Sequence, residues 1–223
     1  MSSKPYPTTD FERSLGNYRY VIGIDEVGRG AVAGPVAVGA FVLDLKTLDV
    51  GKIPTKLQDS KLMTERSREA VFEELSLWQP GFAVGMVEAR EIDSHGIVAS
   101  LAESAVRALK QLAEIDEVKQ ALADNQVHIL LDGTHNWLES VVSRIPITVR
   151  AKADRDCVSV AAAACLAKVT RDRLMVAISS EFPGYDLDGH KGYASASHIQ
   201  AIRTLGPSPI HRVSWLTKIM SGA

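Results

Sequence analysis

The pattern of apolar and polar positions predicts strands that alternate with helices. Runs of mostly β-branched and apolar residues, which are typical of strands, occupy residues 18–25, 35–43, 81–88, 127–132 and 145–154. The fourth run is apolar almost without interruption until Asp132, which is typical of a strand buried on both faces. Strands that alternate with helical segments indicate an α/β fold with a layered core.

Several segments between these runs have the periodicity of helices. Residues 97–114 carry an apolar stripe made of Ile97, Leu101, Ala105, Ala108 and Leu112. Thr64 is a suitable cap for a helix that ends before Pro80-Gly81. Residues 157–182 are alanine-rich and apolar on more than one side, so they predict a long buried helix that ends at Pro183-Gly184. A shorter helix is expected near 195–205, whereas the polar, aperiodic residues 1–18 predict a loose, flexible N-terminal arm.

Composition narrows the class of protein. The 223 residues are 46% hydrophobic and 23% charged, which is ordinary for a globular protein. No apolar run approaches the roughly 20 residues that span a bilayer, and the N-terminus has no signal-peptide core, so we expect a cytoplasmic protein without a membrane partner. Cys157 and Cys165 match no zinc pattern and are expected to be small buried residues. The net charge of −2 neither supports nor excludes a nucleic-acid partner.

The stretch "IGIDEVGRGAVAGPV" at 22–36 raises a chemical question. Asp25 and Glu26 end a strand and lead directly into a glycine turn of the kind that binds phosphate. The pattern from Gly28 to Ala33 fits the G-x-G-x-x-A fingerprint of dinucleotide sites. However, a strand rather than a helix is predicted to follow, and the two acids would repel a phosphate unless a cation lay between them.

A cation site explains the acids better. Asp25 and Glu26 end one apolar run and Asp132 ends another, so parallel neighbouring strands would place these carboxylates side by side. Oxygen ligands of this kind suit Mg²⁺ or Mn²⁺. Asp132-Gly133 could instead be a simple turn, and Asp154 could bind metal or cap the long helix, and the pattern leaves both alternatives open. Clustered acids beside a phosphate-binding turn suggest two-metal hydrolysis of a phosphodiester.

With these residues assembled, the chain closely resembles the bacterial ribonuclease HII family. The resemblance covers residues 20–216 and rests on seven ordered segments: "GIDEVGRGAVAGPV", "DSKL", "LLDG", "KAD", "AAAACLAKVTRDRLM", "HKGY" and "PIHR". It implies an α/β, RNase H-like fold over residues 19–223 as a single catalytic domain. The implied sheet has five strands, one of them antiparallel to the others, with flanking helices and a small C-terminal helical and loop region.

The family resemblance also implies an activity and a site. The implied activity is endonucleolytic cleavage of the RNA strand of RNA/DNA hybrids, and cleavage 5′ of single ribonucleotides in duplex DNA, which leaves 3′-hydroxyl and 5′-phosphate ends. Mn²⁺ or Mg²⁺ is the implied cofactor. The residues that match the family's metal-binding and catalytic carboxylates are Asp25, Glu26, Asp132 and Asp154. Those that match its nucleic-acid contacts are Gly28, Arg29, Gly30, Lys61 and Tyr193.

Two rival functions share part of this pattern. Another RNase H-like nuclease, such as a resolvase, would share the acids but not the ribose-reading tyrosine. A non-enzymatic module could bind hybrids without cutting them. We expect a monomer, and no tail resembling a sliding-clamp-binding peptide follows Trp215. The implied biological role is removal of ribonucleotides from DNA.

Overall fold

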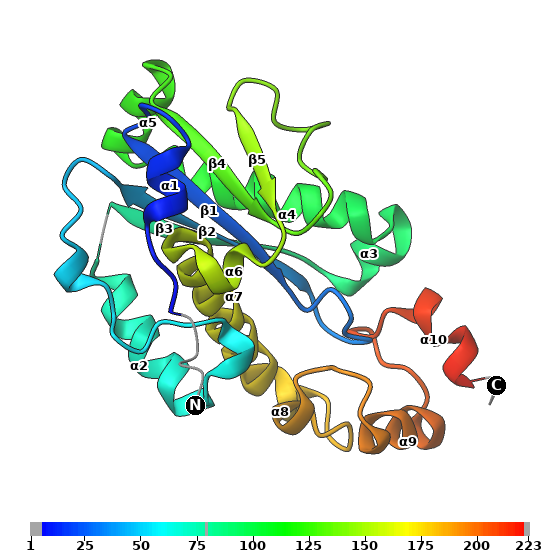
Figure 1. Ribbon diagram of the computed structural model, residues 1–223. Coiled ribbons are helices and arrows are strands. Elements are labelled where there is room, and N and C mark those ends of the chain that lie inside the picture. The colour runs from blue at the N-terminus through cyan, green and yellow to red at the C-terminus, as the bar shows by residue number, and fades with distance from the viewer. Residues whose placement is uncertain (1–5, 79, 221–223) are drawn as a thin grey trace.

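A five-stranded mixed sheet forms the centre of the computed structural model, which describes residues 6–78 and 80–220 (Figure 1). The strand order is β3-β2-β1-β4-β5. The strands are β1 (Tyr20–Val27), β2 (Val36–Asp44), β3 (Gly81–Val87), β4 (Val127–Asp132) and β5 (Ile147–Arg150). β1, β4 and β5 pair in parallel, whereas β2 runs antiparallel to both of its neighbours. The predicted sheet, including its single antiparallel strand, is confirmed.

Helices cover both faces of the sheet. They are α1 (Asp10–Ser14), α2 (Glu65–Ser76), α3 (Ala89–His95), α4 (Ile97–Leu112), α5 (Asp116–Ala123), α6 (Ala153–Asp156), α7 (Val158–Ala177), α8 (Leu187–His190), α9 (Ala196–Leu205) and α10 (Val213–Met220). The apolar stripe of α4 packs with α3 and α5 in one core cluster, while α7 and α2 form the cluster on the opposite face. Helices α8 to α10 extend beyond one end of α7 as the predicted C-terminal region (Figure 1).

The long helix α7 lies unusually close to the sheet. A Cβ atom at Gly23 of β1 would stand 2.2 Å from the backbone of Ser159, and one at Gly39 of β2 would stand 2.3 Å from the carbonyl oxygen of Ala163. Glycines in the strands and alanines in the helix therefore allow this close approach. The two cysteines of this region are free and buried, as predicted, and burial raises the pKa of each thiol to about 12.

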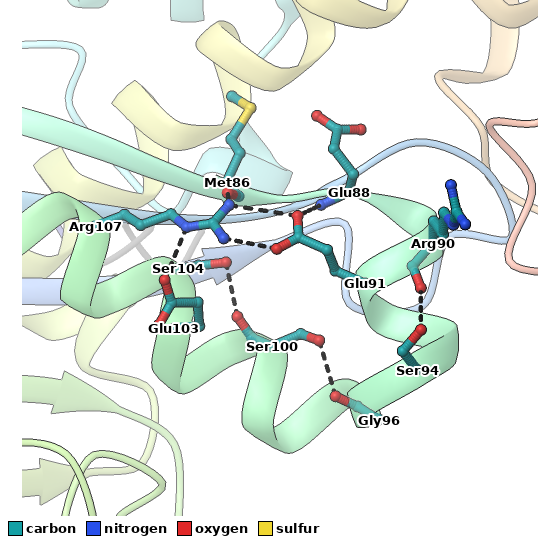
Figure 2. A network of polar contacts seen from close by, with 10 residues as sticks. All are labelled: Met86, Glu88, Arg90, Glu91, Ser94, Gly96, Ser100, Glu103, Ser104 and Arg107. Carbon is teal, nitrogen blue, oxygen red and sulfur yellow. Dashed lines mark hydrogen bonds and ion pairs between the residues drawn. The ribbon is translucent and has the colours of Figure 1, made fainter.

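A polar network fastens α3 and α4 to the end of β3 (Figure 2). The Arg107 guanidinium pairs with Glu91 at 2.7 Å and with Glu103 at 3.0 Å, and it donates to the carbonyl oxygen of Met86 at 2.6 Å. Glu91 also accepts the backbone N–H of Glu88 at 3.2 Å, just before α3 begins. One side chain of α4 thus ties two helices to the strand that precedes them.

The N-terminal segment differs from the loose arm that was expected. Residues 10–14 form α1, and Glu12 is fully buried. Its Oε1 accepts hydrogen bonds from the backbone N–H and the hydroxyl of Ser159, at 2.9 and 3.0 Å. The backbone N–H of Thr8 donates to the carbonyl oxygen of Asp156, and the carbonyl oxygen of Thr8 accepts the N–H of Val158. These contacts pack residues 8–12 against the start of α7, whereas residues 1–5 lie outside the described residues.

Several element boundaries also differ from the prediction. β1 continues through Asp25 and Glu26 to Val27, because all three residues still pair with β2. β5 ends at Arg150 rather than continuing to Asp154, because residues 151 and 152 turn and α6 begins at Ala153. The long helix gives way after Ala177 to a short 3-10 turn. The Thr64 cap is confirmed, since its side chain accepts the N–H of Ser67 at 3.1 Å. Within the described part of the chain, no helix is both long and apolar enough to cross a membrane.

Candidate active site

The predicted acids gather at the carboxyl ends of β1 and β4. Parallel pairing sets Ile24 beside Leu131, so Asp25 and Asp132 follow on adjacent strands, as expected. Asp25 is 5% exposed and accepts the backbone N–H of Glu26 at 2.8 Å. Asp154 lies in the first turn of α6 rather than at a strand end, and it too is buried.

The two carboxylates nearest α6 have different roles. Oδ1 of Asp132 accepts the backbone N–H groups of Ala153 at 2.7 Å and Asp154 at 3.4 Å, so it satisfies free donors at the start of that helix. The Asp154 carboxylate instead binds the Lys61 ammonium at 3.1 Å. Asp132 thus caps α6, and Cys157 rather than Asp154 stands at the N-cap position of the long helix α7. The Asp154 carboxylate is paired with Lys61, and its metal-binding role stays a prediction.

Electrostatics make this cluster unfavourable by itself. Burial, followed by the charges of Glu26, Asp132 and Asp154, raises the pKa of Asp25 well above its usual value. Burial and the charge of Asp154 also raise the pKa of Asp132. Burial would lower the pKa of Lys61, but the hydrogen bond and charge of Asp154 outweigh it and raise that pKa. A positive charge placed among these carboxylates would relieve their mutual repulsion.

The donor chemistry fits a hard divalent cation, although the side chains do not form a ready coordination set. All four acids offer oxygen ligands, which Mg²⁺ and Mn²⁺ prefer. Within residues 6–78 and 80–220, no three acid, histidine or cysteine side chains are arranged to hold a metal ion. Glu26 is paired with Arg29 at 3.2 Å, and Asp154 with Lys61. Joint coordination therefore requires these two carboxylates to turn from their ion pairs.

A cleft of about 460 Å³ opens beside the acids. Every predicted site residue except Asp154 lines it: Asp25, Glu26, Gly28, Arg29, Gly30, Lys61, Asp132 and Tyr193. Ser60, Arg68 and Lys168 complete its polar wall, and sequence reasoning assigned none of these a definite role. A second cavity, of about 500 Å³, shares Glu26, Arg29 and Asp132 and continues toward Trp137. The site is an open groove with both acidic and basic walls.

The glycines of the turn have different functions. Gly28 has a φ of +79°, and a Cβ there would meet Nε of Arg171 at 2.2 Å, so the fold itself requires glycine. Gly30 has no such φ, and nothing lies within 4 Å of the position its Cβ would take. Because Gly30 faces the cleft, its missing side chain leaves room for a ligand. Strand β2 follows this turn, which rules out the dinucleotide alternative.

Two buried arginines hold the turn from behind. Arg212 donates to the carbonyl oxygens of Gly28 at 2.8 Å, Arg29 at 3.0 Å and Gly34 at 3.1 Å. Arg171 donates to three more carbonyl oxygens, those of Ala33, Pro35 and Lys191. Both arginines are fully buried. Sequence reasoning did not single them out, since an arginine in "VTRDR" or "PIHR" carries no local sign of burial.

Tyr193 lies beside Arg171. The guanidinium of Arg171 and the ammonium of Lys168 each lie 5.4 Å from the centre of its ring, and Lys168 is also paired with Asp172 at 2.8 Å. The carbonyl oxygens of Lys191 and Ala33 both bind Arg171, which links the segment before Tyr193 to the glycine turn. The turn and the tyrosine thus form one wall of the cleft.

Comparison with known proteins decides the family. The family model described as ribonuclease HII matches residues 22–218. The chain belongs to the ribonuclease HII family. A curated ribonuclease HII from Streptomyces avermitilis is 39% identical over 218 residues, which cover 95% of this chain and 85% of that protein. The family identifies the chain as a metal-dependent ribonuclease, and therefore as a hydrolase.

Solved structures agree with the fold. The ribonuclease H2 from Pyrococcus horikoshii OT3 is similar with a TM-score of 0.66 and 26% identity, and the match covers 91% of this chain and 98% of that one. Bst-RNase HIII in complex with Mn²⁺ is similar in fold, with a TM-score of 0.67 at 21% identity, over 94% of this chain and 71% of that one. The RNase H-like architecture expected from the sequence is thus confirmed.

Proposed function

We propose that this ribonuclease cuts the RNA strand of RNA/DNA hybrids and cuts duplex DNA 5′ of single embedded ribonucleotides, leaving 3′-hydroxyl and 5′-phosphate ends. One observation carries the proposal: the cleft brings together the carboxylates of Asp25, Glu26 and Asp132, an open glycine turn and Tyr193. An acidic cluster alone would suit many nucleases. An aromatic side chain beside exposed backbone groups is suited to a ribose, whose 2′-hydroxyl alone separates RNA from DNA.

Asp25, Glu26, Asp132 and Asp154 would hold Mg²⁺ or Mn²⁺, and we propose two ions. When bound, such ions supply Lewis-acid polarisation of the scissile phosphate and lower the pKa of an attacking water. Asp25 would be the central ligand, because the other three acids lie close enough for their charges to raise its pKa. Asp132, fixed by the backbone of α6, would set the position of the site relative to that helix.

The basic residues of the cleft would bind the phosphates. Arg29 and Lys61 neutralise Glu26 and Asp154, and both are exposed enough to reach a ligand, with side chains 53% and 75% exposed. We propose that each exchanges its carboxylate for a substrate phosphate, which frees Glu26 and Asp154 to turn toward the metal. The backbone at Gly28 and Gly30 would pack against the ribonucleotide, and Tyr193 would pack on its sugar.

The decisive assay uses a DNA duplex with one ribonucleotide, its all-DNA counterpart and a continuous hybrid, each with Mg²⁺ and Mn²⁺ in parallel. We expect a single cut 5′ of the ribonucleotide and no cut in the all-DNA duplex. Equal cutting of the two duplexes would contradict the proposal and favour a resolvase-like nuclease. Binding without cutting in either metal would favour a hybrid-binding module. We further propose that the protein acts as a monomer in the cytoplasm and that its biological role is the removal of ribonucleotides from DNA.

A further inference from the structure

Three histidines lie directly behind Tyr193: His198 and His211, which are buried, and His190, which is half-buried. His198 is fully buried, and His211 is 2% exposed. The rings of His190 and His198 are stacked, with centroids 4.1 Å apart, and Nε2 of His198 lies 3.1 Å from Nε2 of His211. None of these side chains lines the cleft. They are therefore not candidates for contact with the substrate. Burying polar rings is costly, so a structural role is expected for these side chains.

The hydrogen-bond partners fix where each proton lies. Nδ1 of His198 faces the carbonyl oxygen of Tyr193 at 2.8 Å, and a carbonyl only accepts, so this nitrogen carries a proton. At the other end, the backbone N–H of Ser208 points at Nδ1 of His211 at 3.0 Å, and an N–H only donates, so this nitrogen carries none. The Ser208 hydroxyl lies 2.9 Å from the same nitrogen and can donate to it as well, whereas the Ser208 carbonyl oxygen is farther away, at 3.3 Å. The proton of His211 thus lies on Nε2, and it is donated to Nε2 of His198.

The contact of His198 with Tyr193 and the contact of Ser208 with His211 imply the same direction of donation between the two imidazoles. The chain of hydrogen bonds runs in one direction, from Ser208 through His211 and His198 to Tyr193. It is complete only when both imidazoles are neutral. A second proton on His198 would face the N–H of His211, and a second proton on His211 would face the N–H of Ser208. Burial, reinforced by the nearby His190, lowers the pKa of His198 to about 4 and also lowers that of His211.

This chain of hydrogen bonds connects the glycine turn with Tyr193, the two parts of the site proposed to bind the ribonucleotide. His211 forms an isolated β-bridge with Ala33 of the glycine turn. The N–H groups of Val32 and Ala33 also bind the carbonyl oxygen of Gly192, next to Tyr193. Tyr193 receives a second hydrogen bond from the N–H of Ser195 at 2.9 Å, so its carbonyl is fully occupied.

We propose that His198 and His211 are positioning residues that fix Tyr193 relative to the glycine turn through this one-directional chain of hydrogen bonds. The inference rests on the proposed function only in taking Tyr193 as the residue that packs on the ribose. The ionisable groups that face the pair are His190 from α8 and Tyr185, whose ring centre lies 4.8 Å from that of His211. The guanidinium of Arg212 follows His211 directly in the chain.

The first test reads the protons directly. Long-range ¹H–¹⁵N NMR of the full chain should show His198 as the Nδ1–H tautomer and His211 as the Nε2–H tautomer at pH 7. His198 should stay neutral down to pH 5. The opposite tautomers, or a His198 that is protonated at pH 6.5, would overturn the proposal. This readout does not depend on substrate or activity, so it holds even if the ribose is read by another residue.

The second test uses a matched pair of variants. An asparagine amide can stand in for Nδ1 and a glutamine amide for Nε2, so His198→Asn keeps the donor to Tyr193 and His198→Gln loses it. His198→Gln should lower kcat/KM on a single-ribonucleotide duplex on the order of 10-fold or more, and His198→Asn should restore most of the loss. Equal losses in both variants, at equal melting temperature, would indicate a merely structural role and overturn the proposal.

A double-mutant comparison shows whether the effect passes through Tyr193. In a Tyr193→Ala background, His198→Gln should cause no further loss of activity. Full additivity of the two losses would overturn the proposal. If Tyr193→Ala alone cuts as fast as the wild type, the proposed reading of the ribose is wrong, and the NMR tautomers separately decide whether the chain of hydrogen bonds exists.

Discussion

Two regions border the glycine turn and follow opposite electrostatic rules. On one side is the acidic edge, defined as Asp25, Glu26, Asp132 and Asp154. On the other is the basic support, defined as Arg171, His198, His211 and Arg212. In the acidic edge, like charges that are buried or half-buried repel each other, and burial together with the neighbouring carboxylates raises the pKa values of Asp25 and Asp132. In the basic support, the buried donors meet backbone carbonyl oxygens, and burial lowers the pKa of both histidines.

The difference separates residues kept for chemistry from residues kept for geometry. Buried charges that repel each other cost stability unless a ligand compensates them, so the acidic edge is explained only by what it binds. The basic support is satisfied by the chain itself, and its role is to hold the turn and Tyr193 in place. Substitutions should therefore have opposite consequences for stability and activity on the two sides.

The largest effect should come from Asp25→Asn. Removing the central carboxylate should lower cleavage of a single-ribonucleotide duplex on the order of 10³-fold, about 4 kcal/mol of transition-state free energy. Binding of the duplex should persist, since the basic wall is unchanged. Steady-state cleavage and fluorescence anisotropy measure the two quantities. Loss of binding and cleavage together would show that Asp25 is structural, contrary to the comparison.

The basic support should lose stability instead. Arg212→Lys keeps the charge but cannot span the three carbonyl oxygens of the turn, because an ammonium lacks the planar fork of donors. We expect a loss of about 2 to 4 kcal/mol, or roughly 5 to 15 °C in melting temperature. Arg66→Lys, at an exposed position, is the matched control and should change stability by less than about 0.5 kcal/mol. Similar melting temperatures for both variants would refute the supporting role of Arg212.

Two alanine substitutions distinguish the structural glycine of the turn, Gly28, from Gly30, which faces the cleft. Gly28→Ala should destabilise the protein by about 1 to 3 kcal/mol, because φ is positive and Arg171 occupies the space. Gly30→Ala should leave stability within about 0.5 kcal/mol of the wild type and still reduce cleavage, because the new methyl group enters the cleft. Urea denaturation and the cleavage assay together distinguish the two. A Gly30→Ala variant with full activity would mean that the ribonucleotide does not approach this backbone.

The fold could be predicted from the sequence wherever a segment has a strong apolar pattern. All five strands and the helices around α2, α4, α7 and α9 belong to this class. The pattern did not indicate α1, because five mostly polar residues become helical only when Glu12 is buried against the start of α7. It also extended β5 too far, because the turn at residues 151 and 152 depends on the cap that Asp132 gives to α6.

The acids and the glycines of the site were predictable, and the basic support was not. Strand-end carboxylates and glycine turns are local signals. Arg212 is 178 residues away from Gly34, and Arg171 is 138 residues away from Ala33, so no local pattern reveals these hydrogen bonds. The ion pair of Asp154 was hidden for the same reason, and metal binding by Asp154 stays a prediction. Its partner Lys61 lies 93 residues earlier.

Acid should affect the two regions in opposite directions. Because the pKa of Asp25 is raised in the fold, Asp25 stabilises the protein below its usual value of 3.8, and that contribution is lost as the pH rises through the raised value. His198 contributes stability above 6.5 that is lost as the pH falls toward about 4. Asp25→Asn should thus raise the melting temperature at pH 7.5 and lose this advantage at pH 3.5. His198→Asn should instead reduce the loss of stability between pH 6.5 and 4.5. Thermal denaturation in EDTA measures both changes, and the one at His198 should be about 2 kcal/mol.

The most direct test of the account is thermal denaturation of the wild type and Asp25→Asn with EDTA, Mg²⁺ or Mn²⁺ at pH 7.5. If the acidic edge exists to bind divalent cations, either ion should raise the wild-type melting temperature. At an ion concentration of a hundred times the dissociation constant, the free energy of unfolding should increase by about 3 kcal/mol. The variant should start higher in EDTA and respond little to either ion. A wild type that does not respond, or an equal rise in both proteins, would contradict the account.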